Sequence, residues 1–180
     1  MKIIEDGVGI LAEGVTKIGE YTFRNDSSLT SIVIPEGVTE IGDHTFRYCR
    51  SLTSIVIPSS ITKIGENAFK DCTSLTSIEI PSSVTEIKRS AFEGCTSLTS
   101  VAINGKIKRI DRGTFRGCTA LESITLPTGV NKIAENAFLS CTSLKAIYVP
   151  ANKYDYYYER IPSPFNSLIV EMEPVKKVEE

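Results

Sequence analysis

The sequence predicts an α/β solenoid, an elongated array of about six repeats of 23 residues. The segment CTSLTSIEIPSSVTEIKRSAFEG, residues 72–94, recurs along the chain at this spacing with almost nothing inserted or lost. A fixed period between 20 and 50 residues is typical of solenoids and other arrays. Since no linker interrupts the repeats, we expect one elongated domain rather than two globules.

Apolar residues occupy the same positions in successive repeats, and each such set is called a column. One column contains Phe23, Phe46, Phe69, Phe92, Phe115 and Phe138. Another contains Leu29, Leu52, Leu75, Leu98, Leu121 and Leu144. We expect these columns to point inward, where each buried side chain contributes roughly 1.5–3 kcal/mol. A single repeat cannot cover its own apolar face, so the repeats must stack.

Each repeat begins with a short strand. In SIEIP, residues 77–81, polar and apolar residues alternate, which is typical of a half-buried strand. Pro81 ends this strand because proline has no N–H to donate to a ladder. Equivalent strands that pair in parallel would advance roughly 4.8 Å per repeat.

The remainder of each repeat returns the chain to the next strand. The segment SSVTEI, residues 82–87, is expected to turn and to send Val84 and Ile87 inward. The segment GENAFKDC, residues 65–72, is expected to form one short helical turn on the other side of the solenoid. No helix of ordinary length fits in the residues that remain.

The two ends differ from the middle. The chain opens in a partial first repeat, and its first residues lack the sustained apolar run of a signal peptide. We divide the chain into a repeat array, residues 1–150, and a C-terminal cap with a charged, frayed tail, residues 151–180. Four tyrosines lie within residues 154–158. We interpret them as covering the open end of the array, the alternative being an aromatic patch for sugar or protein contact.

Composition excludes several classes of function. The 20 basic and 22 acidic residues give a net charge of −2, which does not suit a strongly basic nucleic-acid binder. No stretch of 18 apolar residues is present, so we predict no membrane insertion.

The five cysteines form one column. Thiols spaced by the repeat cannot converge on one tetrahedral metal ion. We therefore predict buried thiols that fill space and bond to the backbone, with no metal and no cofactor.

No catalytic constellation is predicted. His44 is the single histidine, at a variable position that we expect to be an exposed helical site. Polysaccharide cleavage would require two acids roughly 5–9.5 Å apart, and the strands offer only Glu79. A column that alternates in sign at most steps contains Lys17, Glu40, Lys63, Glu86, Arg109 and Lys132. We interpret it as an exposed ion-pair ladder, worth about 0–1 kcal/mol per pair.

The candidate binding surface is the outward side of the strands, called the strand-lined face. Its residues are Ser31, Val33, Ser54, Val56, Ser77, Glu79, Ser100, Ala102, Ser123, Thr125 and Tyr148. This face is nearly uncharged and has small side chains, which suits a flat protein partner or a glycan. Tyr148 is its one strong anchor.

The repeat C-x-x-L-x-x-I-x-I-P-x-x-[VI]-T-x-I-G-x-x-A-F resembles the BspA-like (treponemal-type) leucine-rich repeat over residues 10–150. Departures are few: Asn104 replaces the proline, and Lys88, Asp111 and Ala134 replace the turn glycine. The resemblance implies a curved leucine-rich-repeat solenoid whose short parallel strands line the concave face. It also implies a surface-exposed or secreted protein of the kind found in host-associated bacteria and parasitic protists.

We therefore expect a non-enzymatic adhesion module on the cell surface or secreted, which contacts a protein or glycan on a host or microbial surface. A structural spacer is the main alternative. A polysaccharide-acting solenoid enzyme and an engineered repeat scaffold are further alternatives.

Overall fold

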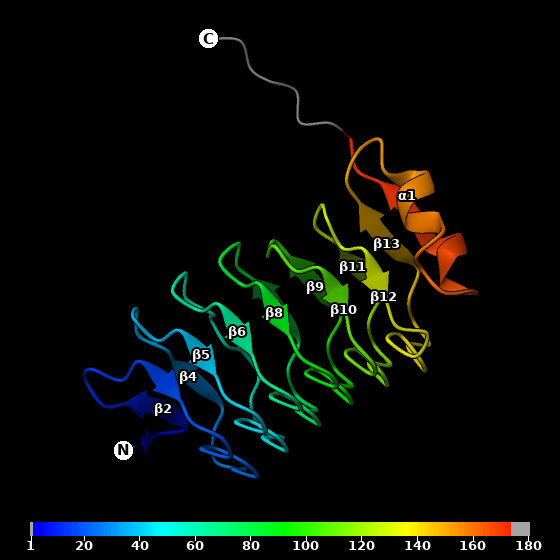
Figure 1. Ribbon diagram of the computed structural model, residues 1–180. Helices are drawn as coiled ribbons and strands as arrows, with labels where there is room; N and C mark the ends of the chain where they lie inside the picture. The colour runs from blue at the N-terminus through cyan, green and yellow to red at the C-terminus, as the bar shows by residue number, and fades with distance from the viewer. Residues whose placement is uncertain (1, 174–180) are drawn as a thin grey trace.

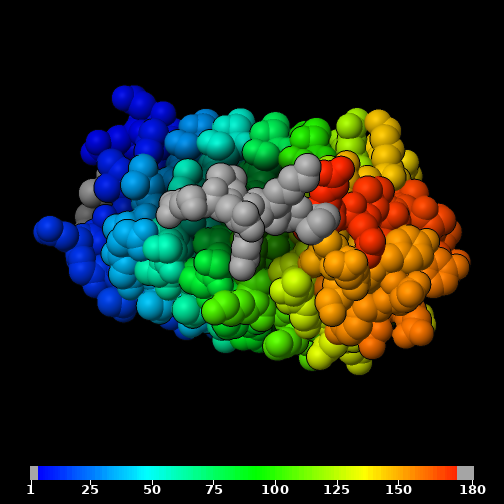
Figure 2. Space-filling view, turned by 90° about the horizontal axis from the view of Figure 1, so that it is seen from above, coloured from blue at the N-terminus to red at the C-terminus, as the bar shows by residue number. Residues whose placement is uncertain are grey.

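The computed structural model describes residues 2–173 as a parallel-strand solenoid of about seven turns. Successive turns are stacked along one long axis from the blue N-terminal end to the orange and red C-terminal end (Figures 1 and 2). The turns contribute strands to two parallel ladders. Paired residues of neighbouring repeats are 23 positions apart in the sequence. Ile124, for example, pairs with Ile147.

The first ladder contains β2 (Val8–Leu11), β4 (Ser31–Val33), β7 (Ser77–Ile80), β9 (Ser100–Ile103), β11 (Ser123–Thr125), β13 (Ala146–Val149) and β14 (Ile169–Glu171). The second ladder contains the two-residue strands β3 (Lys17–Ile18), β5 (Glu40–Ile41), β6 (Lys63–Ile64), β8 (Glu86–Ile87), β10 (Arg109–Ile110) and β12 (Lys132–Ile133). The additional strand β1 (Lys2–Glu5) pairs antiparallel with β2 and covers the N-terminal edge.

Each ladder is interrupted once. Residues 54–57 form no strand, and the backbone hydrogen bond from Thr76 N to Thr53 O is 3.3 Å long, against 2.9 Å for that from Thr53 N to Thr30 O. In the second ladder, Lys106 N donates to Val84 O at 2.9 Å. These residues are 22 positions apart, whereas the equivalent bond from Thr85 N to Thr62 O joins residues 23 apart. Gly105 makes this shift possible, because a Cβ there would lie only 2.5 Å from Val84 O. The shift follows Asn104, which stands where the other repeats have proline.

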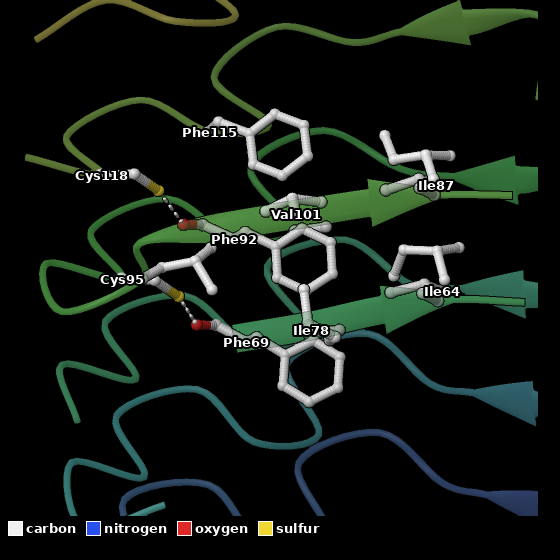
Figure 3. Packing of buried hydrophobic residues seen from close by; sticks show 14 of the residues in the cluster. Ile64, Phe69, Ile78, Ile87, Phe92, Cys95, Val101, Phe115 and Cys118 are labelled. Carbon is white, nitrogen blue, oxygen red and sulfur yellow. Dashed lines mark hydrogen bonds between the residues drawn. The ribbon is translucent and has the colours of Figure 1, made fainter. Parts of the chain in front are cut away.

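The core consists of the stacked apolar columns. Consecutive phenylalanine rings from Phe23 to Phe138 lie 5.1–5.9 Å apart and nearly parallel. Figure 3 shows Phe69, Phe92 and Phe115 in this stack, together with Ile78 and Val101 of the first ladder and Ile64 and Ile87 of the second. The predicted inward direction of the columns is confirmed, since all six rings are at most 1% exposed.

The predicted helical turns are not confirmed. The segments that follow the second ladder are hydrogen-bonded turns, because residues such as Asn67 (φ +52°) and Asp71 (φ +60°) adopt left-handed backbone conformations that end a right-handed helix. Their N–H groups instead reach the next repeat, as in the 2.7 Å bond from Phe46 N to Ala68 O. His44 (φ +57°) is such a half-buried turn residue, so its placement on an exposed helix was wrong.

Helix in the described residues is limited to the C-terminal segment, where α1 (Tyr154–Tyr158) and the 3-10 helix η1 (Phe165–Leu168) precede β14. Phe165 lies edge-on to Phe138 at 5.8 Å, so this segment continues the core beyond the last repeat. Tyr157 is fully buried, and its hydroxyl donates to Pro127 O. Residues 174–180, where a frayed tail is predicted, lie outside the described residues. Between residues 2 and 173, no helix has the length and apolar character needed to cross a bilayer.

Candidate functional site

The register of the first ladder brings the predicted binding residues into two parallel rows. The inner row, which comes first along each strand, is Ser31, Ser54, Ser77, Ser100 and Ser123. The outer row is Val33, Val56, Glu79, Ala102, Thr125 and Tyr148. Within the paired strands, Ser77 is opposite Ser100 and Glu79 is opposite Ala102. The strand-lined face therefore follows the solenoid axis, with its strand pairing interrupted at residues 54–57, which carry Ser54 and Val56.

The outer row is the more exposed of the two at its N-terminal end. Val33 is 68% exposed and Val56 is 78% exposed, whereas Ile55, which points to the other side of the same segment, is 8% exposed. Tyr148 is 36% exposed. Several smaller side chains of the face, such as Ala102, are half-buried because their neighbours cover them.

The structure adds residues that the sequence prediction missed. Ile10 pairs with Val33 and is 41% exposed, and Val170 pairs with Tyr148 and is also 41% exposed. Ile10 lies one 23-residue period before Val33, so its position could have been found. Val170 lies 22 residues after Tyr148, and the repeat gives no signal for it.

The two ends of the strand-lined face have different chemistry. At the N-terminal end, Ile10, Val33 and Val56 present branched aliphatic side chains on consecutive turns. In the middle, the carboxylate of Glu79 accepts a 2.9 Å hydrogen bond from Asn104 Nδ2. The face therefore offers an aliphatic line followed by a polar centre, with the aromatic ring of Tyr148 at its far end.

The cysteine column is structural, as predicted. The thiol of Cys95 donates to Phe69 O at 3.2 Å, and that of Cys118 donates to Phe92 O at the same distance (Figure 3). Burial raises the pKa of both thiols well above the ordinary value, so they are not nucleophiles at neutral pH. Within residues 2–173, no cluster of three or more His, Cys, Asp or Glu side chains is placed to hold a metal ion.

His44 belongs to a stacked aromatic pair. Its ring lies 4.9 Å from that of Tyr21 at an interplanar angle of 8°, and Nδ1 is 3.4 Å from Arg47 Nη1. Burial lowers the pKa of His44, and the charge of Arg47 lowers it further. The imidazole is therefore neutral at pH 7, and its contacts fix the position of one turn against the next.

The predicted ion-pair ladder forms over part of its length. Glu40 lies between Lys17 at 3.0 Å and Lys63 at 3.7 Å, and Lys63 also contacts Glu86 at 3.6 Å. At the shifted repeat, Arg109 contacts Asp111 of its own turn instead. The predicted ladder is thus confirmed from Lys17 to Glu86, and the prediction was wrong at Arg109.

The period, the two ladders and the stacked columns define a leucine-rich-repeat solenoid. The model of the BspA type leucine-rich repeat region matches residues 9–73 and 39–159 with six copies, so the chain belongs to this family. The resemblance stated from the sequence is confirmed.

Solved structures of bacterial proteins show the same fold. A leucine-rich repeat protein from Bacteroides ovatus is 36% identical, with a TM-score of 0.71 over 77% of this chain and 38% of its own. The T. pallidum leucine-rich repeat protein is 28% identical, with a TM-score of 0.63 and 74% of each chain covered. The pneumococcal vaccine antigen PcpA is 18% identical, with a TM-score of 0.81 over 94% of this chain and 42% of its own. Among curated proteins, none matches the chain. The chain thus spans less than half the length of two of these three neighbours.

Proposed function

We propose that the chain is a non-enzymatic protein-binding module that holds its partner on the strand-lined face. One observation carries the proposal: Ile10, Val33 and Val56 form a line of exposed aliphatic side chains on consecutive turns, outside the core. Contiguous exposed apolar surface with a polar surround is typical of interaction sites. The line has no packing role that would explain it, since the core columns are complete beneath it.

The shape and chemistry of the face favour a protein partner over a glycan. Its small side chains allow another backbone or a flat surface to approach closely. Aliphatic side chains gain free energy by excluding water from an apolar partner, at roughly 25 cal/mol per Å² buried. A glycan offers little apolar surface, and the strand-lined face presents only one aromatic ring to it, that of Tyr148.

The proposal includes a location at the cell surface or outside the cell, with a partner on a host or microbial surface. Its support is the family resemblance, which implies proteins of that kind. The chain covers 38% of the length of the Bacteroides ovatus protein. An array of this kind could therefore also act as a spacer within a longer protein, and a spacer would bind no partner through these repeats.

The test is binding of the purified chain to immobilised host matrix proteins and mucin-type glycans by biolayer interferometry at physiological salt. We expect saturable binding to a protein surface that is lost in the double variant Val33→Asp, Val56→Asp. The matched control is Ser82→Asp, Thr128→Asp, which adds the same charge at two exposed turn positions.

If the Val33→Asp, Val56→Asp variant still binds, the aliphatic line is not the binding site. In that case a Glu79→Ala, Tyr148→Ala variant tests the other half of the face. If the unmodified chain binds no member of the panel, the proposed binding function is contradicted and the spacer function is favoured.

A further inference from the structure

A polar groove of about 270 Å³ lies on the turn segments that follow the second ladder, away from the strand-lined face. It runs across the turns that contain Asn67, Ser90, Gly113 and Asn136, which occupy one column. At the N-terminal end this column holds the stacked rings of Tyr21 and His44. The groove opens where the column changes to small residues.

Gly113 is the smallest residue in this column and leaves the most space at the groove. A Cβ at this position would lie 2.9 Å from Ser90 Oγ and 3.4 Å from a carboxylate oxygen of Glu93. Any side chain at residue 113 would therefore enter the space between these groups. The hollow exists because two neighbouring repeats have serine and glycine where the others have larger residues.

The groove lies in the most basic part of the chain. The net charge of the protein is −2. Residues 106–116 nevertheless contain five cations, Lys106, Lys108, Arg109, Arg112 and Arg116, against the single carboxylate of Asp111. Residues 106–116 thus oppose the overall charge of the molecule.

The two carboxylates that line the groove are already paired. Glu66 contacts Arg89 at 2.7 Å, and Glu93 contacts Lys70 at 3.0 Å. By contrast, Arg112 and Arg116 form no ion pair with any residue between 2 and 173. Arg112 also lines an adjoining hollow of about 350 Å³, so it stands at the junction of two cavities. Arg116 acts on the nearby Glu93 carboxylate through its charge, without a close ion pair, so the groove offers the guanidinium groups of Arg112 and Arg116 to an anion.

The amides fix the rest of the recognition pattern. Asn136 Oδ1 accepts from Gly113 N at 3.3 Å, so its NH₂ group is left to donate. Asn67 Nδ2 donates to Glu66 Oε1 at 3.1 Å, so its carbonyl oxygen is left to accept. Ser90 can do both. A mixed set of donors and acceptors matches sugar hydroxyls, whereas carboxylates of an acidic peptide need donors alone.

We infer that this groove is a binding site for an anionic saccharide. Arg112 and Arg116 hold the acidic group, a sulfate ester or a uronic carboxylate, and the amides and Ser90 hold ring hydroxyls. The volume is slightly below the roughly 300 Å³ at which pockets for drug-sized ligands begin, and it suits one sugar residue of a longer chain. The site is independent of the partner proposed for the strand-lined face.

The test is isothermal titration calorimetry of the whole chain with four probes. They are a chondroitin sulfate tetrasaccharide, its unsulfated counterpart, neutral chitotetraose and a tetraglutamate peptide. We expect one or both of the first two to bind and the last two not to bind. The comparison of the sulfated with the unsulfated probe distinguishes sulfate from carboxylate as the anion.

Two variants locate the site. Arg112→Ala, Arg116→Ala is expected to raise the Kd roughly 10- to 100-fold, since charge-assisted hydrogen bonds are lost. The control is Arg24→Ala, Arg50→Ala, which removes the same charge from exposed residues near the N-terminal end of the solenoid. Arg24 occupies the same column as Arg116, and the control should change the Kd no more than about twofold, as screened distant charges do.

A third variant blocks the groove without changing its charge. Gly113→Asn introduces the residue that the column has at Asn67, where it adopts a similar backbone conformation. It should abolish binding while circular dichroism shows the native spectrum. Equal Kd values for the Arg112 and control variants would overturn the inference. So would tight binding of chitotetraose or tetraglutamate, or no binding of either acidic saccharide. Val33→Asp, Val56→Asp should leave this Kd unchanged, which separates the two sites.

Discussion

Removing one ring from the phenylalanine stack should destabilise the whole array. Phe92 is fully buried between Phe69 at 5.2 Å and Phe115 at 5.5 Å, with interplanar angles of 5° and 4°. Phe92→Ala leaves intact the hydrogen bonds made by the backbone of residue 92, namely those from Phe92 N to Thr114 O and from the Cys118 thiol to Phe92 O. The loss is therefore that of the ring alone.

The expected cost is about 4–5 kcal/mol. Phe→Ala substitutions in cores cost about 3–5 kcal/mol, and each aromatic contact adds roughly 0.5–1.5 kcal/mol beyond the area buried. Because Phe92 has a stacked ring on both sides, the upper part of the range applies. In a solenoid, the interfaces with both neighbouring repeats weaken together.

Urea unfolding followed by circular dichroism measures this cost. With a slope of about 2 kcal/mol per molar urea, the unfolding midpoint of Phe92→Ala should fall by about 2 M. Val56→Ala is the control, because Val56 is 78% exposed and surface changes stay within about 0.5 kcal/mol. A loss below about 1 kcal/mol for Phe92→Ala, in the range of ordinary surface changes, would refute the stacked core.

Three further results are expected. The five cysteines should resist a thiol reagent in the native protein and all react in urea, because all five are buried and the reagent cannot reach them; a thiol that reacts quickly in the native state would contradict this. Burial opposes ionisation of Asp43, but hydrogen bonds from Glu66 N–H and Lys88 lower its pKa below 3.8 overall. A lowered folded pKa gives stability that is present above pH 3.8 and is lost as the pH falls through the folded value. The melting temperature should therefore fall more between about pH 5 and about pH 3 in the unmodified protein than in Asp43→Asn, and parallel curves would contradict the ion pair. Tyr157→Phe should cost about 1 kcal/mol in urea unfolding, since the buried bond to Pro127 O is lost; an unchanged midpoint would show that the bond contributes nothing.

The core and the strand-lined face were predictable because they depend on the period alone. Once residues 23 apart are known to be neighbours, the phenylalanine rings must stack and every second strand residue must share a face. The thiol contacts were predictable for a related reason: a small buried residue beside a turn has backbone carbonyls within reach, as Cys95 has at Phe69 O.

The turn conformation was missed although the sequence carried a signal for it. The columns of Gly113 and Gly117 contain glycine, asparagine and aspartate, the residues that most easily adopt positive φ. Glycine, asparagine and aspartate at these two positions of the turn oppose a helix more strongly than the apolar residues of the same segment favour one. The shifted register at Gly105 was a different case, because it depends on how closely two backbones approach, as Gly105 and Val84 do.

The polar groove could not be predicted from single columns. Each ion pair at the groove joins residues 23 apart in one column, Glu66 with Arg89 and Lys70 with Glu93, but the charge of the groove depends on several such columns meeting on the same turns. Its hollow depends on Ser90 and Gly113 being smaller than their column partners in two adjacent turns, the second of which carries Arg112 and Arg116. Only the packed structure shows that these departures coincide.

The two proposed sites consequently obey different rules. The strand-lined face is made from positions that recur on every turn at the strand spacing of about 4.8 Å, so a partner gains contacts by extending along the axis. The groove is made from residues that break the repeat, so it exists once and selects a ligand by local charge and shape. Adding or removing a repeat would lengthen or shorten the face, whereas the groove requires its own run of unlike turns, from Glu66 to Asn136, in their present order. The same stacked core therefore supports one surface tuned by length and another tuned by individual substitutions.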